Sequence, residues 1–474
     1  MEKPENQSEV YIEQIKECLR IHKEQGFTEK TVNLLIKYAD EGNPLTKILL
    51  GDYYKKKGET DKTNKLYEES LTGLEALVKE GHPVIQYLLG YCYYDGRVTK
   101  EDYLKAVEWF QKSADQGYAQ AQLSLGQCYE LGRGVNRDEV EALKLITQAA
   151  DQGLKDAQRY LASCYIWGTL GLWKDPDKAA ELYFKAGDSE ELALLGLSYE
   201  MVNDHDRAVS YYTMAAKLGE PLGQFYLGEC YTEGKGVDID CDVAVEWYTK
   251  AAEQGYDEAQ WKLGECYSEG KGVNIDSTKA AEWFVKAAEN SAYYQWQLGK
   301  LYSEGKGVIK DLQKAEGWFI KAAEKDDEKQ WQLGEFYLRG ENVGQDPEKA
   351  VEWFTKAAKR DNAKAQYSLG YCFENGKGVK KNYKKAVEWY TKAAEQGFDK
   401  AQYNLGEIYF FGRGVIKKNH AKAFEWYHKS AWQGNIDAMK TLSKCYRNGI
   451  GVDKDLAQAE YWKKKAEKAN WLKS

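Results

Sequence analysis

The sequence lacks the compositional features of several protein classes. Only 6 of its 474 residues are proline, while aromatic residues make up 14%, which excludes a collagen-like, proline-rich or disordered chain. No run approaches about 18 consecutive apolar residues, so no membrane-spanning helix is predicted. Acidic residues outnumber basic ones by 75 to 67, and the net charge of −8 argues against a general nucleic-acid or anionic-membrane binder.

The N-terminal segment also lacks an export signal. Its first residues, MEKPENQSEVYIEQ, contain no uninterrupted apolar stretch and no small-residue cleavage pattern, so we expect a cytoplasmic protein, with non-Sec export left open. Seven of the nine cysteines occupy one equivalent position in an internal repeat. Equivalent positions in stacked helices lie about 10 Å apart, too far for a disulfide, which needs Cα atoms within about 7 Å. We expect packing residues in a reducing compartment at Cys92, Cys128, Cys164, Cys230, Cys266, Cys372 and Cys445.

What is present in abundance is the repeat itself. A leucine followed by a small residue recurs twelve times at spacings of 32 to 39 residues, and an aromatic residue always stands three positions after the small one. Such a register indicates a repeat architecture. The small residues are Gly51, Gly90, Gly126, Ala162, Gly196, Gly228, Gly264, Gly299, Gly334, Gly370, Gly406 and Ser443.

Each repeat is predicted to form two helices, which we call helix A and helix B. In the clearest copy, helix A covers residues 257–269, a Gly-Lys-Gly-Val turn follows at 270–273, and Ser277 is a candidate N-cap for helix B. The glycine at the centre of helix A lets the two backbones approach closely, and paired alanines such as Ala287 and Ala288 face it from helix B. One such hairpin cannot bury its apolar faces alone, whereas a stack can.

The predicted fold class is therefore all-α, a right-handed α-solenoid of about twelve stacked helix–turn–helix repeats. We expect an N-terminal capping helical hairpin over 1–43, the first repeats over 44–166, irregular repeats over 167–220, and regular repeats with a C-terminal cap over 221–474. The turn at 167–176 is expanded and the unit at Gly196 has lost its glycine turn. These irregularities predict a change of superhelical curvature near 167–206.

The repeat units resemble a known family. Segments such as LGECYSEGKGV and LGYCFENGKGVKKNYKKAVEWYTKAAEQG are similar to Sel-one-like repeats (SLR), relatives of the tetratricopeptide repeats (TPR) with a longer G-x-G-V turn. The unit at Gly196 looks more like a plain TPR hairpin. The resemblance implies a non-enzymatic adaptor that assembles protein complexes. Some secreted relatives carry paired cysteines within each repeat, and this chain lacks that pairing.

Motifs that look catalytic are explained by the repeat. The phosphate-loop-like segment at Gly264–Gly272 has the wrong spacing and lies at a helix C-terminus, the unfavourable end for phosphate. Ser-x-x-Lys at Ser268 and Ser303 is the same repeat turn, without the companion motifs of serine hydrolases. None of the five histidines has zinc-ligand spacing. We therefore predict no catalysis, no metal and no cofactor.

A binding surface is predicted along helix A. The position three before the small residue is aromatic in seven repeats, and the position four residues later, on the same face, is mostly charged. These side chains form a predicted ladder on the concave surface, outside the core of each repeat, for an extended or helical peptide carrying Lys or Arg. The candidate protein-binding residues are Tyr87, Phe225, Trp261, Glu265, Trp296, Lys300, Trp331, Glu335, Tyr367, Tyr371, Tyr403 and Glu407, with Tyr91 and Glu229 at equivalent positions.

Other interpretations of the same residues stay open at this point. The helix A aromatics could serve packing between repeats alone, and aromatic ladders also stack sugars, so a carbohydrate-binding solenoid is an alternative. An exported effector adaptor is another, and a weak hydrolase is the least favoured. The helix B tryptophans are expected to be core residues: Trp109, Trp247, Trp283, Trp318, Trp353, Trp389, Trp426 and Trp462.

Overall fold

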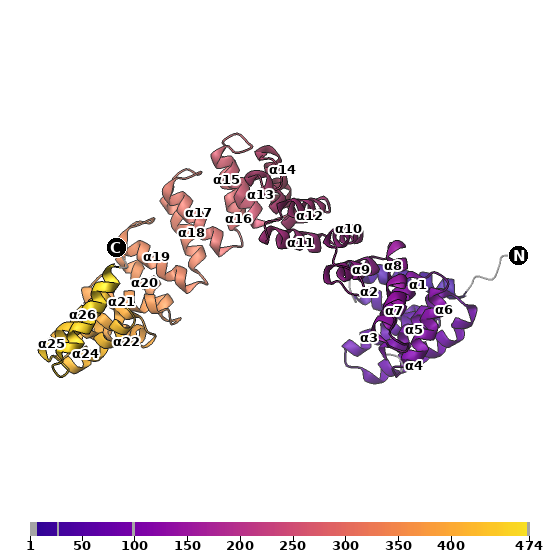
Figure 1. Cartoon of the computed structure of the whole chain (residues 1–474), viewed down its shortest axis with the longest axis horizontal. Helices are drawn as coiled ribbons and strands as arrows, with labels where there is room; N and C mark the ends of the chain where they lie inside the picture. Colours follow the sequence, from indigo (N-terminus) through magenta and orange to yellow (C-terminus); the bar gives the residue numbers. More distant parts are fainter. Residues whose placement is uncertain (1–6, 26–27, 97–99, 472–474) are drawn as a thin grey trace. The chain divides into compact units, whose positions relative to one another are not determined.

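The described part of the protein is built from helices. A computed structural model describes residues 7–25, 28–96 and 100–471, which form 26 α-helices and one short 3-10 helix, with no strand among them. The all-α prediction is confirmed, and successive helices pair as antiparallel hairpins along the chain (Figure 1). The chain divides into two compact units, Met1–Leu227 with Lys235–Val237, and Gly228–Gly234 with Asp238–Ser474.

The first unit contains the helices up to α12 and the start of α13. Its N-terminal region, predicted as a capping hairpin, contains two helices, while residues 1–6 and 26–27 of that prediction lie outside the described residues. The elements are α1 (Gln7–Gln25), α2 (Glu29–Asp40), α3 (Pro44–Lys56), α4 (Thr60–Leu77), η1 (Val78–Glu80), α5 (Pro83–Asp95), α6 (Tyr103–Ala114), α7 (Ala119–Leu131), α8 (Glu139–Asp151), α9 (Lys155–Trp167), α10 (Pro176–Ala186), α11 (Ser189–Met201), α12 (His205–Lys217) and α13 (Pro221–Glu233).

The second unit contains the rest of α13 and all later helices. Almost every helix A here has 13 residues, as the constant spacing of the repeat requires. The elements are α14 (Cys241–Glu253), α15 (Asp257–Glu269), α16 (Ser277–Ala288), α17 (Ala292–Glu304), α18 (Leu312–Ala323), α19 (Asp327–Arg339), α20 (Pro347–Ala358), α21 (Ala363–Asn375), α22 (Tyr383–Glu395), α23 (Asp399–Phe411), α24 (His420–Trp432), α25 (Ile436–Asn448) and α26 (Leu456–Trp471).

The glycine turn ends helix A and aligns helix B. Gly270 adopts a left-handed conformation (φ 73°) and donates its N–H to the carbonyl of Cys266, which closes the C-terminus of α15. The N-cap of α16 is Asp276 rather than the predicted Ser277, because the Asp276 carboxylate accepts hydrogen bonds from two backbone N–H groups of the first turn. The Asp276 N–H in turn donates to the carbonyl of Tyr267 at 2.9 Å, which fixes the turn against helix A.

The close approach of the two helices is confirmed. A Cβ atom placed on Gly264 would lie 2.6 Å from the ring of Phe284 in helix B, a distance that real Cβ atoms do not tolerate. Ala287 and Ala288 are buried on the same helix. In most hairpins an aromatic ring of helix B therefore packs directly on a glycine of helix A, whereas Gly126 faces the aliphatic Ile146.

The irregular repeats depart from this pattern where expected. Helix α10 has only 11 residues, and in the expanded turn before it Leu170 has a positive φ of 53°. In the unit at Gly196, Asn203 (φ 62°) takes the left-handed conformation that glycine provides elsewhere. The predicted change of superhelical curvature near 167–206 stays a prediction.

Candidate functional site

The predicted helix A aromatics belong to the hairpin cores. Trp261 has its ring centroid 4.6 Å from that of Phe284, and Trp296 lies 4.7 Å from Phe319, the helix B ring of its own repeat. The prediction that these residues lie outside the core of their repeat is therefore wrong. The reason is that the neighbouring glycine brings the helix B ring so close that it reaches the residue three positions earlier. Trp296 is consequently only 6% exposed.

The same aromatics also connect successive repeats. The ring of Trp261 stacks on Tyr294 of the next helix A at 5.0 Å, and Trp296 stacks on Phe336 at 5.4 Å. Trp331 makes a polar link instead, since its indole N–H donates to Ser368 Oγ of α21 at 3.1 Å. Phe225 is buried, and the five tyrosines or tryptophans that remain half-buried in this row are Tyr87, Trp261, Trp331, Tyr367 and Tyr403.

The predicted glutamates are held by donors of the protein itself. Glu407 accepts a hydrogen bond from the Tyr427 hydroxyl at 2.6 Å, and Glu229 accepts one from Tyr248 at 2.5 Å. Glu265 accepts the indole N–H of Trp261 at 3.0 Å. Burial and the hydrogen bond to Glu407 raise the pKa of Tyr427 above its usual range, so the hydroxyl keeps its proton and its partner carboxylate stays the acceptor.

The side chains of the predicted surface that face solvent are few. Tyr91 and Tyr371 are 37% and 38% exposed, and Lys300 is half-buried with no side-chain hydrogen bond or ion pair in the described part of the chain. Whether these residues bind a partner stays a prediction. The structure places them on the helix A face, where a ligand can reach them.

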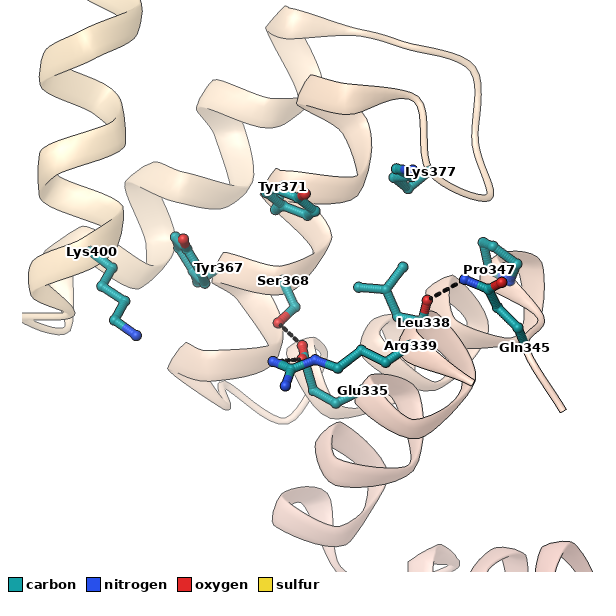
Figure 2. A pocket seen from close by; sticks show the side chains of 10 residues that line it. All are labelled: Glu335, Leu338, Arg339, Gln345, Pro347, Tyr367, Ser368, Tyr371, Lys377 and Lys400. Atoms are coloured by element: carbon teal, nitrogen blue, oxygen red, sulfur yellow. Dashed lines mark hydrogen bonds and ion pairs between the residues drawn. The ribbon is translucent and has the colours of Figure 1, made fainter. Parts of the chain in front are cut away.

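A cavity of about 440 Å³ opens beside Tyr371, between α19, α21 and α23. Figure 2 shows Tyr367 and Tyr371 of α21 on one wall, with Lys400 of α23 on one side of the cavity and Arg339 of α19 on another. Three of the predicted binding residues therefore line one cavity. The full lining is Glu335, Leu338, Arg339, Gln345, Pro347, Tyr367, Ser368, Tyr371, Lys377 and Lys400.

The carboxylate of this cavity is part of a hydrogen-bond network. Trp331 donates to Ser368, whose hydroxyl donates to Glu335 Oε1 at 2.9 Å. The guanidinium of Arg339 donates to Glu335 Oε2, also at 2.9 Å. Both oxygens of Glu335 thus have a donor within the protein, and the cations Lys377 and Lys400 lie at the rim. The sequence pattern did not point to these two lysines, because Lys377 lies in the glycine turn and Lys400 six residues before Gly406. Neither position belongs to the predicted ladder of aromatic and charged residues.

A larger, more apolar cavity of about 630 Å³ lies in the first unit, between α1, α3 and α5. Its walls are aliphatic side chains of helix A together with Ile12 and Ile15 of α1. The repeat pattern does not predict this cavity, because α1 precedes the first recognisable repeat. Its apolar lining includes Ile12, Ile15, Leu45, Ile48, Leu49, Val84, Leu88 and Tyr118.

A row of buried glutamines also escaped prediction. Gln402 donates to the carbonyl of Ala394 at the end of the preceding helix B (2.9 Å) and accepts from Gln433 at the end of its own helix B (3.0 Å). It therefore links the C-terminal ends of two successive helices B, α22 and α24. The repeated Gln four residues before the glycine was the available signal. Its buried members are Gln86, Gln122, Gln158, Gln224, Gln260, Gln330, Gln366 and Gln402.

The helix B tryptophans are less buried than predicted. Trp353 and Trp462 are buried, but the others among the eight are half-buried. In seven of the eight, a lysine three residues later lies over one face of the ring. In α16 the Lys286 ammonium lies 3.8 Å from the Trp283 ring centroid, a cation–π contact. Equivalent lysines lie over Trp109, Trp247, Trp318, Trp353, Trp389 and Trp426.

The cysteine prediction agrees with the structure. All nine cysteines are free thiols, and eight of them are buried, with Cys241 the exception. Burial raises the pKa of Cys372 to about 12, as expected for packing residues. In the residues that the structure describes, no group of three or more His, Cys, Asp or Glu side chains is arranged to hold a metal ion. No helix within these ranges is both long and apolar enough to cross a membrane.

Solved structures of repeat proteins resemble this chain. A protective antigen present in uropathogenic Escherichia coli strains, displaying an SLR fold, is 32% identical, with 92% of this chain and 96% of that chain covered and a TM-score of 0.42. A Sel1 repeat protein from Oxalobacter formigenes is 29% identical over 70% of this chain and 89% of its own, with a TM-score of 0.45. A search of curated proteins found no match.

The family model for the Sel1 repeat matches eleven segments that together cover most of the chain. They run from the hairpin of α5 and α6 to that of α25 and α26, and include the irregular unit at Gly196. The matched residues are 84–118, 119–154, 155–190, 192–220, 221–256, 257–291, 292–327, 330–362, 363–398, 399–435 and 436–470. Sel1 repeat proteins generally act as protein-interaction scaffolds and are typically non-catalytic. With these matches and the repeated glycine-seated hairpins described above, the chain is a member of the Sel1 repeat family.

Proposed function

We propose that the protein is a non-enzymatic scaffold that binds a protein or peptide partner on its helix A face. The observation that carries this proposal is the cavity of the second unit, whose lining includes Glu335, Tyr367 and Tyr371. These three residues occupy the repeat positions at which the sequence pattern predicts a binding surface. Tyrosine and arginine, which both line this cavity, are enriched in protein-binding surfaces, and charged groups are common at the rim.

The helix A aromatics that pack against other rings are not available to a partner, whereas the exposed ones are. Trp261 and Trp296 stack inside and between repeats, so they stabilise the wall that supports the surface. Tyr91 and Tyr371 keep more than a third of their area in solvent. The partner therefore meets tyrosine rings and flanking charged groups, on a wall that the tryptophans keep rigid.

The test is an affinity capture with two matched variants. Tyr91→Ser with Tyr371→Ser removes two exposed rings from helix A, whereas Leu104→Ser with Tyr461→Ser removes two exposed apolar side chains from helix B. Both variants should keep the circular-dichroism spectrum and melting profile of the wild type. We expect the wild type and the helix B variant to capture the same protein from extracts of its own cells.

The helix A variant should lose that partner. Equal capture by both variants would contradict the assignment of the face. Capture that survives proteolysis of the extract and disappears after glycosidase treatment would contradict a protein partner and favour the carbohydrate alternative.

A further inference from the structure

We propose that the cavity between α19, α21 and α23 binds an acidic peptide segment of the partner, through Lys377 and Lys400. This inference rests on the proposed function and adds the chemistry of the ligand. It reverses the polarity expected from the sequence, which was a ligand carrying Lys or Arg beside glutamates. The reversal follows from three features of the repeat at this one place.

The first feature is that Lys400 has no acidic partner in the described part of the chain. In the preceding repeat the equivalent lysine, Lys364, forms an ion pair of 2.6 Å with Glu328, the residue at the same position one helix A earlier. For Lys400 that same position is occupied by Lys364 itself. Lys400 therefore extends from α23 toward the cavity as an exposed cation, and no ion pair to it exists within the described ranges (Figure 2).

The second feature is that Lys377, in the glycine turn after α21, also has no acidic partner among the residues that the structure describes. In the second unit the turn cation of other repeats pairs with a carboxylate in one of two ways, whereas Arg133 of the first unit donates to the Tyr94 hydroxyl. Arg413 pairs with Glu374 of the preceding repeat at 2.6 Å, and Lys271 pairs with Glu269 of its own repeat at 2.6 Å. The residues at these two positions for Lys377 are Leu338 and Asn375.

The third feature is that Glu335, the carboxylate of the cavity lining, is already paired with Arg339. Its two oxygens accept from Ser368 and from Arg339, so the cavity lining carries one paired carboxylate against three cations, with Lys377 and Lys400 left over. Figure 2 shows Lys400 and Lys377 on opposite sides of the cavity. An acidic peptide that crosses the cavity can therefore pair with each lysine through a different side chain, without displacing an existing ion pair. The tyrosine wall provides apolar contact for the peptide beside it.

The overall charge of the protein is negative, so a positively charged cavity is a local exception to it. With a net charge of −8, the chain repels polyanions at most of its surface. Binding of an acidic peptide therefore reports on a site rather than on a general cationic surface. Opposite charges across an interface also restrict which partners can dock.

The experiment measures binding of a fluorescein-labelled decapeptide of alternating glutamate and glycine to the full chain, by fluorescence anisotropy. Peptides with Gln or Lys in place of Glu serve as comparators, and a single-stranded oligothymidine as a nucleic-acid probe. The variant Lys377→Gln with Lys400→Gln tests the site. The matched control, Lys417→Gln with Lys464→Gln, makes the same charge change at exposed lysines outside the cavity.

We expect the Glu peptide to bind about tenfold more tightly than the Gln peptide, and the site variant to lose about tenfold in affinity. The control variant should stay within about twofold of the wild type. Equal binding of the Glu and Gln peptides, tighter binding of the Lys peptide, or equal losses in both variants would overturn the inference. So would an oligothymidine that binds more tightly than the Glu peptide and depends on the same two lysines.

A failure here leaves the proposed function intact if the Tyr91/Tyr371 variant still loses its protein partner in the capture assay. If that capture also fails, the helix A face is not the binding surface. The two assays therefore separate an error in the ligand chemistry from an error in the function.

Discussion

The glycine at the crossing of the two helices gives a quantitative test of the repeat geometry. In the hairpin of α17 and α18, a Cβ on Gly299 would lie 2.6 Å from the ring of Phe319. That ring cannot move aside easily, because it is buried against Trp296 at 4.7 Å and Phe336 at 5.2 Å. Gly299→Ala therefore overpacks the core, at a typical cost of about 1–3 kcal/mol.

Part of this cost is offset by helix propensity. Replacing a helical glycine by alanine stabilises a helix by roughly 0.5–1 kcal/mol, so the net destabilisation should be about 1–2 kcal/mol. The same hairpin contains a matched control in Gly317 of α18, where an added Cβ meets nothing within 4 Å. Gly317→Ala should show the propensity gain alone.

The assay is native-state hydrogen exchange read by mass spectrometry, because a repeat array does not unfold as one two-state unit. Peptides from α17 and α18 should exchange about 5- to 30-fold faster in Gly299→Ala and about 2- to 5-fold more slowly in Gly317→Ala. Equal protection in the two variants would refute the argument that the ring requires glycine opposite it.

Three further predictions concern polar and titratable groups. The hydrogen bond to Asp257 and burial raise the pKa of Glu258 to about 7. The folded state then binds the proton more tightly than the unfolded state, so the contribution of Glu258 to stability falls as pH rises from about 4.5 to 7. Chemical denaturation of Glu258→Gln should show a weaker pH dependence in this range, and an unchanged dependence would contradict the assignment. The buried Gln330 Oε1 has no hydrogen-bond partner in the described part of the chain, because Arg360 stands where other repeats have the donating glutamine. Arg360→Gln should therefore slow hydrogen exchange in α19 and α20 by a factor that corresponds to about 1 kcal/mol. Faster exchange would contradict the role of the glutamine row. Thiol titration with a disulfide reagent at pH 8 should modify Cys241 first and leave the eight buried thiols slow; a buried thiol that reacts equally fast would show that its repeat opens readily.

The periodic part of the fold could be predicted because one physical constraint repeats in every unit. The hairpin geometry is fixed by a glycine such as Gly264, by the aromatic ring opposite it and by the glycine turn that follows. Helix boundaries followed from the same spacing, and the remaining error, Asp276 in place of Ser277 as N-cap, arises because both residues are good caps and a carboxylate accepts two N–H groups at once.

The site could be predicted only in part, for a reason that lies in the packing. Helical periodicity places Trp296 and Tyr371 on one face, but it does not say how far the neighbouring ring reaches, so a buried residue and an exposed one looked alike. Unpaired cations are equally invisible to a repeat pattern. The ion pairs of Lys364 and Arg413 show which repeat positions pair, and the cavity brings Lys377 and Lys400 into one lining, so both observations need the structure.

The most direct measurement of the central claim is site-specific photo-cross-linking in the cells that make the protein. A photoreactive phenylalanine analogue at Tyr371 or Tyr91 reports on the helix A face, and the same analogue at Tyr461 of α26, which is 48% exposed, is the control. The account predicts covalent adducts with one protein partner at Tyr371 or Tyr91 and none at Tyr461. Adducts at Tyr461 with none at the two helix A positions would contradict it.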